Sequence, residues 1–256
     1  MAENQYGFPT EVLSLPSKGL LYPEDSPLRS GTIDVKYMTA KEEDILTSTN
    51  LIEQGVVITK LIESIIANPK VKLDDMLVGD KNAVMVGTRI LGYGKDYGIT
   101  LIDPDTNERV EHIVDLTKLE NKPIDEKLFE NGNNFTLELP NSKRVIGFKL
   151  LTQKDEREIE EVLKDYEKAE KLTGISYKGT TRLKHQIVSI DDNTDQKVID
   201  DFVDNEFLAL DTRAFRKYLD KITPDIELKF DYTSQTGNLH KMDVPLGLDF
   251  FWPAAE

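Results

Sequence analysis

The sequence predicts an α+β protein made of two internally repeated halves, each with short strands, a helical cluster and a β-hairpin. Three features that recur in the same order support this prediction: a strand that ends at a proline, a strand that leads into a capped helix, and a hairpin. Residues 11–120 form the first predicted α+β repeat and residues 134–250 form the second, with a polar linker over residues 121–133.

The first feature is a short strand that stops at a proline. Apolar and polar residues alternate in LSLPSK, which ends at Lys18, and in LELPNSK, which ends at Lys143. Alternation with period two predicts a half-buried strand, and a proline followed by polar residues predicts a turn. Each repeat is therefore expected to open with a strand and a turn.

The second feature is a strand that leads into a helix with a capping box. Thr39 and Thr152 stand where a threonine can cap a first turn, and Glu42 and Asp155 follow three residues later. In such a box, each side chain satisfies a backbone N–H of the other residue. One match of this kind is common, whereas two in the same order favour a repeat.

A helix with an aspartate near its start follows in each repeat. Asp80 and Asp211 stand where an aspartate can N-cap a helix, so we interpret both as caps and not as catalytic acids. The apolar residues behind them keep helical spacing. They are Ala83, Val84, Val86, Ile90 and Leu91 in the first helix, and Ala214, Phe215, Tyr218, Leu219 and Ile222 in the second.

Each repeat is predicted to end in a hairpin. The turn residues are Asp103-Pro104-Asp105 in the first hairpin and Thr236-Gly237-Asn238 in the second. The segment from Asp103 imitates the start of an EF-hand loop, but Glu108 stands where glycine is needed and Val114 where a bidentate acid is needed. The paired segments are 97–101 with 110–116, and 226–230 with 240–246.

Three further helices are predicted from apolar periodicity. They cover residues 55–68, residues 154–172 and residues 196–203. Gly174 follows the second of them as a C-terminal cap. The basic stretch Arg182–His185 is interpreted as a solvated face.

Composition narrows the classes of function. The chain has 256 residues, no cysteine and a formal charge of −15. The lack of cysteine removes disulfides, thiolate nucleophiles and cysteine-based zinc sites. The acidic balance argues against nucleic acid as a partner, and no apolar run approaches the ~18 residues of a membrane span. The start of the chain lacks the pattern of a signal peptide, so a cytoplasmic location is expected.

Catalytic and metal-binding motifs are not recognised either. The histidines His112, His185 and His240 are scattered, and the acidic pairs carry little information in so acidic a chain. We therefore expect neither an enzyme nor a cofactor or metal site, and we expect the chain to act through contacts with other proteins.

Both ends of the chain hold candidate contact residues. Residues 1–30 are predicted to form an extended N-terminal arm and first strand, and residues 248–256 an aromatic C-terminal tail. The tail either folds back onto its own core or docks on a neighbour, because Trp and Phe are favoured anchors at interfaces. The candidates are Tyr6, Phe8 and Tyr22 near the start, and Phe250, Phe251, Trp252 and Pro253 near the end.

Three segments carry a likeness to a known family. They are Leu15–Gly19 (LPSKG), Tyr37–Leu46 (YMTAKEEDIL) and Val86–Gly94 (VGTRILGYG). In these segments and in the order of its elements, the chain resembles the baseplate hub and hub-assembly proteins of T4-like phages. The resemblance implies a structural component of a contractile tail baseplate, in the hub region. Its expected partners are other tail and baseplate proteins, and it is expected in several copies within a symmetric assembly.

The resemblance has further implications. It implies a location in the tail baseplate of the virion after assembly in the host cytoplasm. Two alternatives stay open: a hub-assembly chaperone that is not retained in the virion, and a hydrolase with an acidic site. Relatives often carry cysteine pairs in the two hairpins, in parts that resemble zinc ribbons. Here Asp103-Pro104-Asp105 and Tyr232-Thr233-Ser234 stand there instead, which implies that turns and packing replace a metal.

Overall fold

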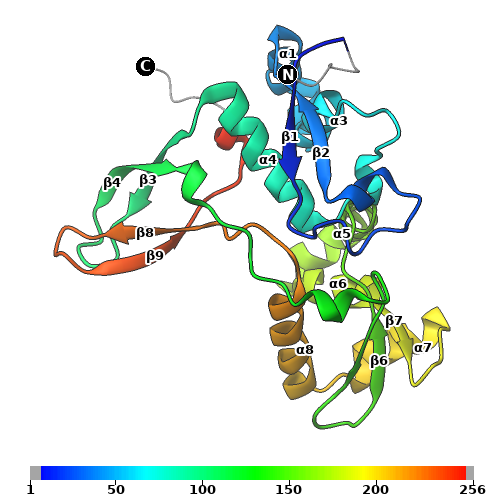
Figure 1. The fold of residues 1–256 in the computed structure, drawn as a ribbon. Coiled ribbons are helices and arrows are strands. Elements are labelled where there is room, and N and C mark those ends of the chain that lie inside the picture. The colour runs from blue at the N-terminus through cyan, green and yellow to red at the C-terminus, as the bar shows by residue number, and fades with distance from the viewer. Residues whose placement is uncertain (1–6, 252–256) are drawn as a thin grey trace.

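Helices α1 to α8 and several small antiparallel sheets build the protein, as the computed structural model shows for residues 7–251 (Figure 1). The predicted α+β class is thereby confirmed. Within these residues, no helix is long and apolar enough to cross a membrane. The structure has three parts, namely an N-terminal unit, a C-terminal unit and a lobe made of two hairpins.

The N-terminal unit packs a two-stranded sheet against helices. The strands are antiparallel, and β1 lies against α4 because Gly87 leaves room for Leu13. A Cβ atom at Gly87 would lie 2.5 Å from a methyl carbon of Leu13. The elements are β1 (Thr10–Ser14), β2 (Thr32–Lys36), α1 (Ala40–Leu46), α2 (Thr49–Glu53), α3 (Val57–Ile65) and α4 (Val78–Tyr93).

The C-terminal unit has a three-stranded sheet in the order β5-β6-β7. Its elements are β5 (Phe135–Glu138), β6 (Val145–Phe148), α5 (Gln153–Thr173), α6 (Lys178–Gln186), β7 (Ile187–Ile190), α7 (Gln196–Asp201) and α8 (Ala209–Ile222). Gly174 caps α5 in the left-handed conformation, as predicted. Neither α6 nor β7 was predicted from the sequence, because α6 is polar apart from Leu183 and β7 is only four residues long.

The two predicted hairpins are present and lie together in the lobe (Figure 1). The first joins β3 (Asp96–Ile102) to β4 (Arg109–Asp115), and the second joins β8 (Lys229–Thr233) to β9 (Leu239–Asp243). The second hairpin begins later than the predicted Ile226, because Ile226 forms a bridge with Asn121 instead.

The predicted linker runs antiparallel to the segment that follows α8. The Lys122 N–H donates to the Asp225 carbonyl at 2.8 Å, and the Glu227 N–H donates to the Glu120 carbonyl at 2.7 Å. Further along, Phe129 is buried. The chain between the halves is therefore bonded to the protein along part of its length.

A second pair of backbone segments joins the two units. Leu77, just before α4, forms an antiparallel bridge with Thr152, just before α5. The Gln153 N–H donates to the Met76 carbonyl at 2.8 Å, and the Val78 N–H donates to the Leu151 carbonyl at 3.3 Å. We call this contact the unit junction, with sides 76–79 and 150–153.

Both predicted capping boxes mark helix starts, at α1 and α5. The Thr39 N–H and hydroxyl donate to Glu42, at 2.9 and 2.6 Å, and the Thr152 N–H donates to Asp155 at 2.8 Å. Each acid also lies near a lysine three residues before the threonine. Lys36 is 3.2 Å from Glu42 and Lys149 is 2.6 Å from Asp155.

The prediction that Asp80 is an N-cap is wrong. Leu77 holds that position, and Asp80 lies in the first turn of α4. Its buried carboxylate accepts hydrogen bonds from the Ser17 N–H at 2.9 Å, the Ser17 hydroxyl at 2.6 Å and the Tyr22 hydroxyl at 2.6 Å. Asp80 therefore holds the turn after β1, and burial raises its pKa despite these bonds.

Asp211 is likewise not an N-cap, because Leu208 precedes α8 at that position. Asp211 accepts from the Asn141 N–H at 2.8 Å and from the Ser142 N–H at 3.0 Å, so it holds the turn after β5. Burial opposes its ionisation, yet these amides lower its pKa.

The two halves thus share helix caps, carboxylate-held turns and terminal hairpins in the same order. The segments between these marks also correspond in part. Ile66, directly after α3, bridges Val35 of β2. In the same way Ile187, directly after α6, pairs with Phe148 of β6. These shared contacts support an internal duplication, which stays a hypothesis.

The contact between Asp80 and the turn after β1 can be tested by substitution. Asp80→Ala leaves the buried Ser17 N–H and Tyr22 hydroxyl without their acceptor, and each such group costs about 1–3 kcal/mol. We expect urea unfolding to show that loss. Asp44→Ala, on the exposed side of α1, is the control and should change the free energy of unfolding by less than about 0.5 kcal/mol. Equal effects of the two substitutions would contradict this role of Asp80.

Candidate interaction site

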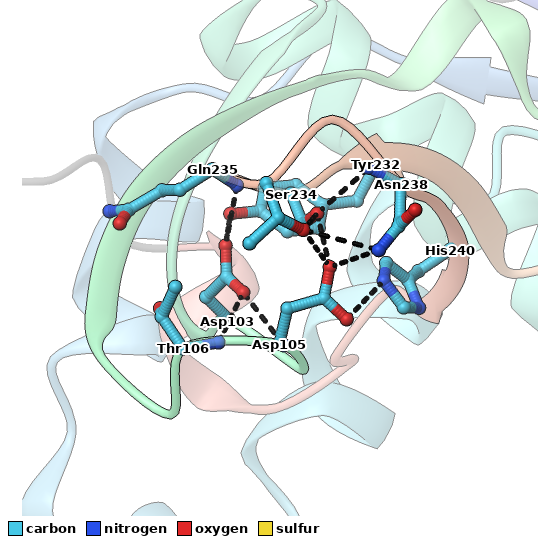
Figure 2. Close-up of polar contacts among 9 residues, drawn as sticks. Asp103, Asp105, Thr106, Tyr232, Ser234, Gln235, Asn238 and His240 are labelled. Carbon is cyan, nitrogen blue, oxygen red and sulfur yellow. Dashed lines mark hydrogen bonds and ion pairs between the residues drawn. The ribbon is translucent and has the colours of Figure 1, made fainter.

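The tips of the two hairpins meet in a polar cluster, which we call the hairpin clasp (Figure 2). One side comes from the turn after β3, and the other from the end of β8, the turn that follows it and the first residues of β9. The bonds join residues about half the chain apart in sequence. The clasp comprises Asp103, Asp105 and Thr106 on the first hairpin and Tyr232, Ser234, Gln235, Thr236, Asn238 and His240 on the second.

Asp103 bonds to both hairpins. One carboxylate oxygen accepts from the N–H groups of Asp105 at 2.8 Å and Thr106 at 3.1 Å, which shapes its own turn. The other accepts from the Gln235 N–H at 2.9 Å and the Tyr232 hydroxyl at 2.8 Å. The Gln235 amide, followed by the Tyr232 hydroxyl, lowers the pKa of Asp103 to about 2.

Asp105 bonds to several side chains of the second hairpin. Its Oδ2 accepts from the hydroxyls of Ser234 and Thr236 and from the Asn238 amide nitrogen at 3.0 Å. The His240 Nε2 lies 3.1 Å from its Oδ1, an ion pair when the imidazole is protonated. The Ser234 and Thr236 hydroxyls are the main reason that the pKa of Asp105 lies well below its usual range.

Aromatic rings back the clasp. His112 of β4 stacks on Phe230 of β8, with ring centroids 5.1 Å apart, and meets Tyr232 edge-on at 5.4 Å. Ring contacts of this kind stabilise beyond the area that they bury. The lobe is therefore held by polar bonds at its tip and by rings behind them.

The clasp stands where the resemblance implied turns and packing in place of a metal. Among residues 7–251, no group of three or more His, Asp or Glu side chains is placed to hold a metal ion. The Asp103–Glu108 segment is a turn, as predicted, with Asn107 at φ 60°. Sequence reasoning missed the clasp, although alternating polar residues at 234, 236, 238 and 240 were a signal.

The outward face of the lobe exposes apolar side chains. Ile102 and Ile113 lie on the same face of the first hairpin, which alternation along the paired strands requires. They are 56% and 66% exposed. Leu239 of β9 is 68% exposed, but it lies on the outer face of the second hairpin, because the opposite face carries Phe230 and Tyr232, which contact the first hairpin. The lobe thus combines a fixed shape with exposed apolar residues.

Tyr22, a predicted contact residue, lies in the core. Its side chain is buried, and its hydroxyl accepts from the Leu77 N–H at 2.9 Å while donating to Asp80. Residues 10–14 of the predicted arm form β1, and Leu15 and Leu21 are buried. The described part of residues 1–30 thus differs from an extended arm, because its apolar residues pack on the N-terminal unit.

Phe250, another predicted contact residue, is fully buried in the described chain. Its carbonyl accepts a hydrogen bond from Arg89 Nε of α4 at 2.8 Å, and its ring meets Tyr97 edge-on at 4.9 Å. Arg89 is itself buried and also donates to the carbonyls of Gly94 and Asp96. Phe250 is therefore a core residue, not an exposed anchor.

The remaining predicted contact residues differ in burial, and some lie outside the described chain. Phe251 is fully buried and packs on Phe250. The structure thus favours the fold-back alternative for both phenylalanines. Phe8 is 39% exposed and stays a candidate. Tyr6, Trp252 and Pro253 lie outside the described residues.

Acidic residues also line a hollow of about 780 Å³ between α5, α6 and α7. Each of them has its own partner. Asp155 bonds to Lys149 at 2.6 Å, and Asp204 bonds to Lys184 at 2.7 Å. Asp200 accepts from Gln196 at 2.9 Å. The carboxylates do not converge on one point, so this hollow gives the hydrolase alternative no support.

Low pH should weaken the hydrogen bonds of the hairpin clasp. The pKa of free Asp is about 3.9 and that of Asp103 is about 2. The stability that its ionisation contributes is therefore complete above about pH 4 and is lost as the pH falls toward 2. We expect Asp103→Asn to reduce the free energy of unfolding at pH 7 and to make it decrease less between pH 4 and 2. Hydrogen exchange of the β3 and β8 amides, with urea unfolding, measures this.

Asp231→Asn, on an exposed position of β8, is the matched control for Asp103→Asn. This substitution should leave the pH dependence of the free energy of unfolding the same as in the protein without substitutions. If Asp103→Asn also leaves the pH dependence unchanged, another acid governs this pH range. Glu42 is such an acid, because its pKa, although raised by burial, is lowered to about 2 by hydrogen bonds from Thr39.

Phe250→Ala separates a core role from a docking role. Removal of a fully buried phenylalanine ring costs about 3–5 kcal/mol, so we expect a loss of that size in the isolated protein by urea unfolding. Phe8→Ala, at a partly exposed position, should cost less than about 1 kcal/mol. An unchanged stability of Phe250→Ala would favour docking on a neighbour.

Comparison with known proteins gives one match. A sequence model of the family described as T4 bacteriophage base plate protein matches residues 14–252. No curated protein and no solved structure matches the chain. The match spans nearly the whole chain, from β1 through both units and the lobe. This protein therefore belongs to the family of T4 bacteriophage base plate proteins.

Proposed function

We propose that this protein is a structural component of the hub region of a contractile tail baseplate, where it acts through contacts with other tail and baseplate proteins. The family supports a place in the baseplate. The hub role, the several copies and the assembly in the host cytoplasm are parts of the proposal. Catalysis is not part of it.

The hydrogen bonding of the buried acidic side chains is the observation that best supports this proposal. Every buried carboxylate of the described chain bonds to backbone, hydroxyl or ammonium groups that shape a turn, a helix start or the clasp. A buried charge is tolerated when it is hydrogen-bonded in this way. These acids are Glu42, Asp80, Asp103, Asp155 and Asp211. Their arrangement suits a rigid scaffold.

The lobe offers a contact surface for a neighbouring baseplate protein. Its residues Ile102 and Ile113, on the outer face of the first hairpin, are each more than half exposed. An exposed apolar patch rimmed by polar residues is typical of an interaction site. The clasp keeps the two hairpins together, so a partner would meet a preformed surface and lose little entropy on binding.

An assembly chaperone of the hub could use the same surface. It would meet the baseplate proteins during assembly and leave afterwards. Quantitative mass spectrometry of purified virions separates the two functions. Stoichiometric amounts of the protein support the structural role, and its absence from infectious particles supports the chaperone.

The contact surface is tested with Ile102→Glu combined with Ile113→Glu, introduced into the phage genome. We expect these changes at exposed positions to preserve folding but to weaken incorporation at least about tenfold, equivalent to 1.4 kcal/mol. Leu172→Glu, at the 87% exposed end of α5, is the matched control. Normal incorporation of the double variant would show that the lobe face is not the contact surface.

A further inference from the structure

The unit junction has a counterpart that is not covered. Under the duplication hypothesis, Thr152 corresponds to Thr39 and Leu77 corresponds to Leu208, as the shared helix starts indicate. The two sides of the junction, 150–153 and 76–79, therefore correspond to residues 37–40 and 207–210. The first pair of segments meets within the chain, whereas the second pair faces solvent.

Exposure distinguishes the two pairs clearly. Leu77 and Leu150 at the junction are 4% and 2% exposed. Their counterparts Leu208 and Tyr37 are 50% and 40% exposed, and Leu210 beside Leu208 is 64% exposed. Apolar residues at corresponding places are thus covered in one case and open in the other.

We propose that residues 37–40 of one copy pair with residues 207–210 of the next copy, as residues 150–153 pair with residues 76–79 within the chain. The occupant of each open segment is therefore a second copy of this protein. Different surfaces meet in such a head-to-tail contact, so it either closes into a ring or continues as a filament. The proposal rests on the duplication hypothesis and does not require the hub role.

Charges at corresponding positions are compatible with this pairing. Lys154 and Asp75 line the same hollow beside the unit junction. Their counterparts are Lys41 and Glu206, which keep both signs and are exposed. Glu206 contacts Arg144 at 2.9 Å at the surface, where such a pair contributes little and can rearrange.

One contact beside the unit junction, between Gly79 and the segment after α8, cannot be repeated between copies. Gly79 lets the Pro224 carbonyl oxygen approach to 1.9 Å from where a Cβ would lie. The counterpart of Gly79 is Leu210, whose side chain excludes so close an approach. The contact between copies therefore lacks this neighbouring contact, and we expect association that depends on protein concentration.

Cross-linking tests the pairing directly, because the chain has no cysteine of its own. Purified Ala40→Cys and Ala209→Cys proteins are mixed and treated with a short bis-maleimide. Both positions are exposed, so folding should be preserved. We expect a cross-linked dimer with one chain of each variant, and larger products from a protein that carries both cysteines.

The control mixture replaces Ala209→Cys by Leu172→Cys, an 87% exposed position outside the proposed contact. Several-fold more dimer in the test mixture supports the proposal. Equal yields in both mixtures would overturn it, because random collisions would then explain the product.

Sedimentation velocity over a range of concentrations gives an independent readout. We expect Leu208→Glu to weaken self-association at least tenfold and Leu172→Glu to leave it unchanged. A protein that stays monomeric at every concentration, or that associates equally well with Leu208→Glu, would overturn the proposal. Purified protein alone is the sample, so failure here is distinct from failure of incorporation into virions.

Discussion

A buried carboxylate that captures the N–H groups of a distant turn is the interaction on which this structure depends. Asp80 and Asp211 each lie in the first turn of a helix and hold the turn after the first strand of their unit. Asp103 does the same across the two hairpins. Such a group must be satisfied, because burying an unpaired charge is very unfavourable. Each contact therefore sets the position of two segments at once.

The two halves of the chain are not independent in space. The linker pairs with the segment after α8, and the unit junction joins α4 to α5. Each half also contributes one hairpin to the shared lobe, and Phe250 near the end of the chain packs on Arg89 of the N-terminal unit. These crossings make a single scaffold from two similar units.

This organisation connects the fold to its role in a baseplate. The acids of the core shape turns and helix starts, so the residues available to partners are exposed apolar ones such as Ile113 and Leu208. The lobe face is the proposed contact for a different protein, and the open junction segments are the proposed contact for another copy. A component of a large assembly needs both kinds of contact.

The sequence by itself determined the α+β class, the capping boxes at Thr39 and Thr152, the two hairpins and the family likeness, because all of these depend on local spacing. It did not determine α6 or β7, whose residues lack strong periodicity. Tertiary structure alone decided that Asp80 and Asp211 hold distant turns, that Phe250 is buried, and that the hairpin tips meet. The physical reason is that a carboxylate or a ring accepts many partners, and only the folded chain selects which one lies within reach.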